Sequence, residues 1–122
     1  MTAASVEVTG TRRIVSSTPA NTSEATLYTV PDGSKTNVLV EIWITNLTGS
    51  AANATVKWGD GSTDYSLIDT KSIAARDYHR VACLIPMRES YTIKITSGTN
   101  SALTFTVVVI EFGGAFGGNS AR

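Results

Sequence analysis

The feature that most constrains the fold is the alternating segment VLVEIWITN, residues 38–46. Successive side chains of a β-strand point to opposite faces of a sheet, so a period of two predicts one face toward a core and one face away from it. A strand with one apolar and one mixed face is typical of a sandwich of two sheets. The apolar face would hold Val38, Val40, Ile42 and Ile44, and the mixed face would hold Leu39, Glu41, Trp43 and Thr45.

Short segments of the same kind recur along the chain between turn-forming residues. Pro31-Asp32-Gly33 and GDGS, residues 59–62, are typical turn sequences, and SSTPANTSE, residues 16–24, is too rich in Ser, Thr, Asn and Pro for regular structure. No segment of ten or more residues has the period of an amphipathic helix, and residues 69–76 would make at most one helical turn. The predicted strands are 5–9, 12–16, 25–30, 38–46, 54–58, 64–68, 78–84, 91–96 and 102–112, with a connector at 72–76 and a stop near Pro86.

These elements predict an all-β fold, a single jelly-roll-like β-sandwich over residues 17–112. Residues 1–16 would form an N-terminal arm or the first strands, and the Gly-rich C-terminal tail, residues 113–122, has too much glycine to fold alone. A chain of 122 residues is long enough for one domain with a core of its own. Its single cysteine, Cys83, excludes an internal disulfide.

The charge balance argues against two classes of partner. Ten basic residues balance ten acidic ones, and charged residues make up only 16% of the chain. The sequence therefore lacks the basic surface that nucleic acids or anionic membranes attract. It begins without an apolar signal segment and has no apolar run of membrane-spanning length. We expect no nucleic acid and no membrane among its partners.

Asp77, His79 and Cys83 are reactive residue types that fall close together in the sequence. On one strand they would share a face, but His79 and Cys83 would stand about 13 Å apart, beyond the hydrogen-bond reach of a catalytic pair. A surface histidine and a core cysteine are the simpler interpretation. Ser90 has no histidine near it in the sequence. We therefore predict a protein that is not an enzyme, with no catalytic residues, no cofactor and no small-molecule substrate.

The segment KWGDGSTD, residues 57–64, has the pattern closest to a known motif. Asp60 and Asp64 take the first and fifth positions of a calcium loop, but the ligand set is incomplete. A hairpin is the simpler interpretation, because Asp-Gly between two strands favours a tight turn. We predict a hairpin tip at Gly59–Ser62 and no metal site. The WGDGS sequence also resembles the core of PKD-type sandwich domains, although the phenylalanine and the spacing of that motif are absent.

Four aromatic residues admit two interpretations. Trp43, Trp58, Tyr65 and Tyr78 would either form a carbohydrate-binding platform on one sheet or fill a core or a subunit interface. Aromatic side chains fill cores and interfaces more often than they bind sugars, so the second interpretation is favoured.

Three segments together resemble small structural proteins of tailed-phage virions. They are STPANTSEATLYTVPDGSKTNVLVEIWITNLTGSAANATVKW at 17–58, SIAARDYHRVACLIPMRESYTIKITSG at 72–98 and ALTFTVVVIEF at 102–112. The part at 26–52 is the most telling. The resemblance implies a β-sandwich on the capsid surface of the virion, a decoration or cement protein that stabilises the head by bridging major capsid proteins. Such a protein would be made in the cytoplasm of the host bacterium. The alternatives are a tail, neck or fibre component, or a carbohydrate-binding sandwich for host attachment.

We expect self-association as a homotrimer, with contacts through the two ends of the chain. The strand at 102–112 is apolar on both faces toward its end, which favours an interface at Val108, Ile110 and Phe112. Phe116 stands alone among glycines and would anchor the tail in a groove of a neighbour. The basic pair Arg12-Arg13 lies in the N-terminal segment and would contact the shell or a neighbouring subunit.

Overall fold

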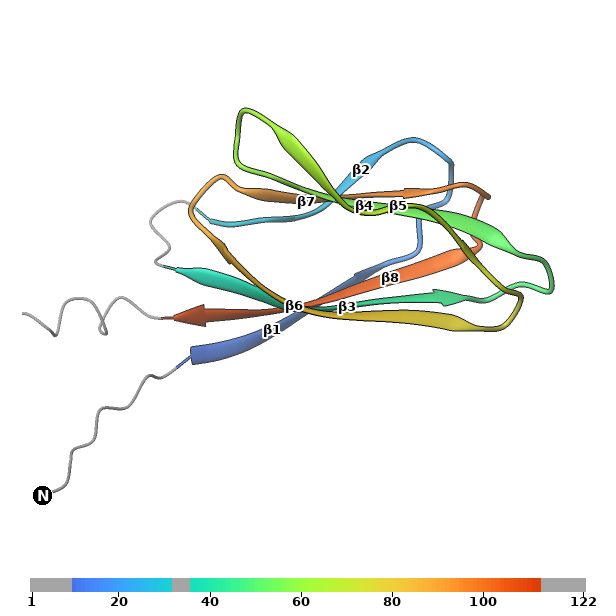
Figure 1. Cartoon of the computed structure of the whole chain (residues 1–122), viewed down its shortest axis with the longest axis horizontal. Coiled ribbons are helices and arrows are strands. Elements are labelled where there is room, and N and C mark those ends of the chain that lie inside the picture. The colour runs from blue at the N-terminus through green and yellow to red at the C-terminus, as the bar shows by residue number, and fades with distance from the viewer. Residues whose placement is uncertain (1–9, 32–35, 113–122) are drawn as a thin grey trace, which may run out of the picture.

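Two antiparallel sheets packed face to face make up the part of the chain that the computed structural model describes, residues 10–31 and 36–112 (Figure 1). β-branched and aromatic residues dominate the strands, which suits a pleated, half-buried surface. The all-β, jelly-roll-like sandwich predicted from the sequence is confirmed. The strands are β1 (Gly10–Ser17), β2 (Ala25–Thr29), β3 (Asn37–Asn46), β4 (Ala52–Gly59), β5 (Asp64–Ile73), β6 (Tyr78–Met87), β7 (Thr92–Ser97) and β8 (Leu103–Phe112).

The order of strands interleaves the two sheets. Sheet I has the order β1-β8-β3-β6, and sheet II has the order β2-β7-β4-β5. Only β4 and β5 are consecutive in the chain and paired with each other; the other connections cross between sheets. The first and last described strands are neighbours, and Gly10 of β1 pairs with Phe112 of β8. Both ends of the described chain therefore leave the sandwich at the same end of sheet I (Figure 1).

The core lies between the inner faces of the two sheets. Buried apolar side chains cluster there, with Phe105 of β8 among the largest. Period-two alternation explains the cluster, since every second residue of a strand points inward. The side chains from β3, β7 and β8 with essentially no exposure are Leu39, Ile42, Ile44, Ile93, Ile95, Leu103, Phe105, Val107 and Val109.

A β-bulge in β3 changes which residues of the alternating segment face the core. The register of β3 shifts between Leu39 and Glu41 against both of its neighbours, β6 and β8. One extra residue reverses the phase of the alternation. Leu39 is therefore buried with Ile42 and Ile44, whereas Val38 and Val40 are only partly buried. The prediction that Val38 and Val40 share the core face is wrong for this reason.

Two predicted boundaries differ most from the structure, the ends of β5 and β6. β6 does not stop before Pro86 but continues to Met87. The proline is tolerated within the strand because β6 lies at the edge of sheet I. β5 continues to Ile73, so Ser72 and Ile73 are strand and not connector. The chain turns instead at Ala74–Asp77, where Arg76 has a φ of 60° and the Asp77 amide donates to the Ala74 carbonyl.

Asn46 is a buried polar residue that holds the loop after β3. Its Nδ2 donates to the carbonyls of Ser50 (2.8 Å) and Ile73 (3.0 Å), and its Oδ1 accepts from the backbone amide of Thr48 (2.9 Å). Satisfied in this way, a buried amide stabilises the loop and does not destabilise the core. The part of the chain that the structure describes holds no helix long and apolar enough to cross a membrane.

Candidate docking surface

The outer face of sheet I is the surface that points away from the core. Its residues follow from the register, because they alternate with core residues such as Val107 and Val109. Ile14 pairs with Val108, and Val108 pairs with Glu41, so the three side chains stand side by side. The outer face of sheet I comprises Arg12, Ile14, Ser16, Glu41, Trp43, Tyr78, Arg80, Ala82, Leu84, Thr106, Val108 and Ile110.

Large apolar side chains are exposed on this face. Ile14 is 62% exposed, Tyr78 58% and Leu84 78%. Val108 lies in the middle of the sheet, between Ile14 and Glu41 on the neighbouring strands, and only 8% of it is accessible. A continuous apolar surface on a folded domain commonly marks a contact site, whereas single exposed apolar residues do not.

A polar and aromatic cluster occupies the part of this face formed by β3 and β6. Trp43 Nε1 donates to Glu41 Oε1 (2.9 Å), and Arg80 Nε donates to Glu41 Oε2 (3.0 Å). The Arg80 guanidinium lies 5.4 Å from the Trp43 ring centroid, and Tyr78 stacks on Trp43 with centroids 5.5 Å apart. The hydrogen bonds from Trp43 and from Arg80 lower the pKa of Glu41. The cluster therefore presents a stacked aromatic pair beside a carboxylate whose charged form is stabilised.

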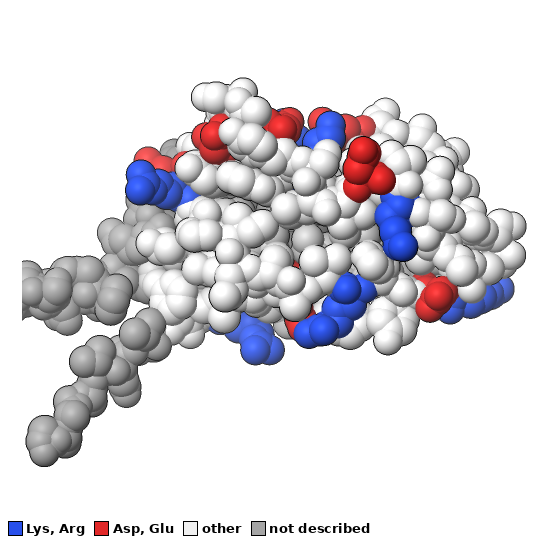
Figure 2. All heavy atoms as spheres, in the orientation of Figure 1, with Lys and Arg blue, Asp and Glu red and all other residues white. Residues whose placement is uncertain are grey.

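The outer face of sheet II has a different character. Thr55 pairs with Thr96 and Lys57 with Lys94, so polar side chains line its centre. The lysines form ion pairs, Lys57 with Glu24 (3.4 Å) and Lys94 with Asp64 (3.0 Å). Acidic and basic side chains are interspersed over the surface in view, with no large patch of one sign (Figure 2). The outer face of sheet I therefore carries exposed apolar side chains beside its charged ones, whereas the outer face of sheet II is polar at its centre.

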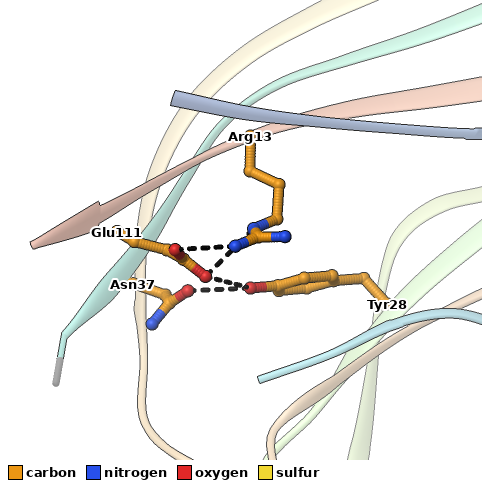
Figure 3. Close-up of polar contacts among 4 residues, drawn as sticks. All are labelled: Arg13, Tyr28, Asn37 and Glu111. Atoms are coloured by element: carbon orange, nitrogen blue, oxygen red, sulfur yellow. Dashed lines mark hydrogen bonds and ion pairs between the residues drawn. The ribbon is translucent and has the colours of Figure 1, made fainter. Parts of the chain in front are cut away.

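A partly buried polar cluster joins the two sheets near the ends of the described chain (Figure 3). Arg13 donates to both carboxylate oxygens of Glu111, at 3.1 Å each. The Tyr28 hydroxyl is placed to donate to Asn37 Oδ1 (2.8 Å) and, at longer range, to Glu111 Oε2 (3.3 Å). Hydrogen bonding to Glu111 raises the pKa of Arg13, and burial followed by the Glu111 charge raises the pKa of Tyr28. β1, β3 and β8 of sheet I are thereby linked to β2 of sheet II.

The residues predicted to make subunit or shell contacts fall in different places. Arg12, Val108 and Ile110 lie on the outer face of sheet I, and Phe112 ends β8 beside Gly10. Arg13 instead turns toward Glu111 and belongs to the polar cluster. Phe116 lies outside the described residues. Sequence reasoning missed Glu41, Tyr28, Asn37 and Glu111, whose partners come from distant strands and are marked by no local motif.

The segment 57–64 forms a hairpin, as predicted. The Asp60 amide donates to the Thr63 carbonyl (3.1 Å), and the Asp60 carboxylate accepts from the amides of Ser62 and Thr63 (2.9 Å each). These amide hydrogen bonds lower the pKa of Asp60. Asp64 forms an ion pair with Lys94 (3.0 Å). Within residues 10–31 and 36–112, no group of three or more His, Cys, Asp or Glu side chains is arranged to hold a metal ion.

Two of the residues considered for catalysis, Asp77 and Cys83, form structural hydrogen bonds. Asp77 accepts a hydrogen bond from the Tyr78 amide (2.8 Å). Cys83 packs partly buried against the core and donates to the Leu39 carbonyl (3.6 Å), and burial raises the pKa of its thiol. A raised pKa makes the thiol a weak nucleophile at neutral pH. His79 alternates inward on the same strand, and Ser90 lies in the turn before β7 with a φ of 75°.

The four aromatic residues do not form a platform on one sheet. Trp43 and Tyr78 stack on sheet I, whereas Trp58 contacts Tyr65 on sheet II with ring centroids 4.9 Å apart. Trp58 also stacks on Tyr91, which packs against the core, with centroids 5.9 Å apart. The single-platform interpretation is therefore wrong, because the strand order divides the residues into two pairs.

Comparisons with known proteins identify the fold and no family. No protein-family model matches the chain, and no curated protein does. A chain from disulfide-linked pili of Bacillus endospore appendages is similar with a TM-score of 0.56 and 14% identity, over 93% of this chain and 96% of that chain. A chain from the acid-stable capsid of Helicobacter pylori bacteriophage KHP30 is similar with a TM-score of 0.55 and 11% identity, over 87% of this chain and 91% of that one. At these identities the likeness concerns the sandwich alone.

Proposed function

We propose that the protein is a phage virion structural protein, a decoration or cement protein that stabilises the head by bridging major capsid proteins. The observation that carries the proposal is the set of exposed apolar side chains on the outer face of sheet I, namely Ile14, Tyr78 and Leu84. A surface of this kind loses its contact with water when a partner covers it. Assembly by burial requires no reactive group.

The similar fold in the phage KHP30 capsid supports this assignment. That chain is about as long as this one, since the alignment covers nearly all of both. A sandwich of this size and topology therefore occurs in a phage capsid, although the identity of 11% says nothing about shared residues. The pilus chain has the same fold within an assembly of many copies, which is consistent with a structural role.

The proposed mechanism relies on many weak contacts. Each copy would cover a junction between capsid subunits with the outer face of sheet I, and the symmetry of the shell would repeat that contact many times. We propose a homotrimer as the unit that binds, with Val108, Ile110 and Phe112 at or near the contacts. Phe116 and the rest of the tail 113–122 would bind neighbouring subunits in the same assembly.

Imaging of the virion tests the location. Antibody labelling of intact particles, followed by electron microscopy, should mark the head at regular positions. Label confined to the tail, neck or fibres would contradict the decoration role. Particles that lack the protein should also lose their genome at a lower temperature than complete particles, and adding the purified protein should restore the difference. Unchanged heat stability would contradict the cementing role.

A further inference from the structure

The edges of the two sheets differ in how well they are protected against pairing with another strand. An unpaired edge offers free backbone amides and carbonyls to any extended chain, and proteins usually blunt it with proline, bulges or very short strands. The sandwich has four edge strands, namely β1 and β6 in sheet I and β2 and β5 in sheet II. Each can be examined for these protective features.

Three of the four edges are blunted. β6 contains Pro86 and lies against a register shift in β3. β5 has two register shifts against β4, and Thr70 within it has a φ of 50°. β2 is only five residues long and has a register shift between Thr26 and Tyr28. Another strand would find no regular ladder on any of these edges.

β1 is the exception. Its eight residues pair with β8 in unbroken register, from Gly10 with Phe112 to Ser17 with Phe105. It holds no proline and no residue of positive φ, and seven of its eight residues are exposed. Within the described chain, no strand pairs along its other side. Its two charges do not protect it fully, because Arg13 is neutralised by the bidentate pair with Glu111.

We propose that the free edge of β1 pairs with β1 of a second copy, antiparallel across a two-fold axis at Ile14. In an antiparallel ladder, directly opposite residues share a face of the sheet, so the residues that face outward, Arg12, Ile14 and Ser16, must oppose one another. An axis at Arg12 or Arg13 would put like charges directly opposite, which is unfavourable. An axis at Ile14 sets Ile14 against Ile14, Arg12 against Ser16, and Arg13 against Val15.

The chemistry of this register is complementary. The two Ile14 side chains, each 62% exposed in the single copy, cover one another and extend the apolar outer face across the junction. Arg12 faces the Ser16 hydroxyl and no second cation. The two sheets I then form one sheet of eight strands. The contact closes after two copies, so it could link the proposed trimers to one another but could not form the trimer itself.

The area of an edge-to-edge contact is small, so the association is expected to be weak in solution and to gain strength when copies are held side by side. Disulfide trapping suits a weak contact. Opposite residues of a ladder have Cα atoms about 4.5–5.5 Å apart, within the range that a disulfide spans. The variants Ile14→Cys, Arg12→Cys, Ser16→Cys and Leu84→Cys are made in a Cys83→Ala background, so that each chain carries one thiol.

The proposal predicts a specific order of cross-linking rates in a glutathione buffer. Ile14→Cys should form a disulfide dimer at least about tenfold faster than Leu84→Cys, which is more exposed but lies on the blunted edge β6. Arg12→Cys and Ser16→Cys should each dimerise slowly alone and form the mixed dimer quickly when combined.

Equal rates for Ile14→Cys and Leu84→Cys would overturn the proposal, and so would a mixture of Arg12→Cys and Ser16→Cys that gains nothing over the separate proteins. These outcomes are independent of the virion assignment, because the rates are measured on the purified protein. If antibodies label the head but no rapid disulfide dimer forms, the decoration role stands and the β1 contact fails. If the disulfide dimer forms as predicted but antibodies do not label the head, the β1 contact stands and the decoration role fails.

Discussion

Arg13 and Glu111 are 98 positions apart in the chain, yet their side chains form a bidentate ion pair between β1 and β8, with both contacts at 3.1 Å. The same carboxylate lies 3.3 Å from the Tyr28 hydroxyl of the opposite sheet. One carboxylate therefore connects the first and last described strands to the other half of the sandwich. The consequences for stability, pH dependence and binding can be measured.

Tyr28→Phe removes the hydroxyl that spans the two sheets while the ring remains. Because Asn37 Oδ1 is buried and loses this donor, we expect the free energy of unfolding to fall by about 1–2 kcal/mol. Urea denaturation monitored by tryptophan fluorescence measures it. Tyr65→Phe is the matched control, since Tyr65 is 44% exposed; an equal loss in both variants would contradict the role assigned to the cluster.

Glu41→Gln should lower stability at neutral pH and have less effect in acid. The folded state holds the pKa of Glu41 below its ordinary value of 4.5, mainly through the Trp43 hydrogen bond and then through Arg80. The ionised carboxylate therefore stabilises the fold above that value, and the contribution is lost as pH falls through the lowered pKa. Urea midpoints of wild type and variant should converge well below pH 4.5. Trp43→Phe removes the hydrogen-bond donor to Glu41, so in that background Glu41→Gln should change the urea midpoint less. A difference in urea midpoint between wild type and Glu41→Gln that stays constant with pH would count against this account.

Asp60→Ala should lower the melting temperature by removing the acceptor for the amides of Ser62 and Thr63. Asp60→Asn keeps an acceptor oxygen and should retain most of the stability. Differential scanning calorimetry of the three proteins gives the comparison, with and without calcium. A calcium-dependent rise in the wild-type melting temperature that disappears in Asp60→Ala would restore the metal-site interpretation of this turn.

Ile110→Lys should weaken binding to capsids without unfolding the protein, because Ile110 is a partly exposed residue of the outer face of sheet I. Thr96→Lys is the control, since Thr96 is equally half-buried but lies on the polar outer face of sheet II. Co-sedimentation with capsids that lack the protein measures both. If Thr96→Lys impairs binding and Ile110→Lys does not, the docking surface has been assigned to the wrong sheet.

The fold class was predictable because the alternation of Tyr91, Ile93 and Ile95 and the Asp60-Gly61 turn are local signals. The phase of β3 was not, because the bulge at Val40 depends on the register of two neighbouring strands. Pro86 led to a wrong prediction of the end of β6 for a related reason. A strand can contain a proline when it lies at the edge of a sheet, and the sequence does not show that β6 does.

The residues of the candidate docking surface were harder to predict from the sequence, because strand pairing in the folded chain brings them together. Val108 and Ile110 lie on the outer face of sheet I, and the subunit interface predicted there stays a prediction. The aromatic residues could be assigned to sheets only from the strand order, which puts Trp43 and Trp58 on different sheets. No spacing in the sequence brings Arg13 to Glu111 or Tyr28 to Asn37, because crossovers between the sheets set those distances.

The pairing of Gly10 with Phe112 has a mechanical consequence. A load applied through the two ends of the described chain pulls β1 and β8 apart from their shared end, along the interstrand hydrogen bonds and perpendicular to the strands. Such a load opens the ladder one rung at a time, whereas strands pulled from opposite ends must break many rungs together. The Arg13–Glu111 ion pair lies among the first residue pairs of this ladder. It therefore sets the force at which β1 begins to separate from β8.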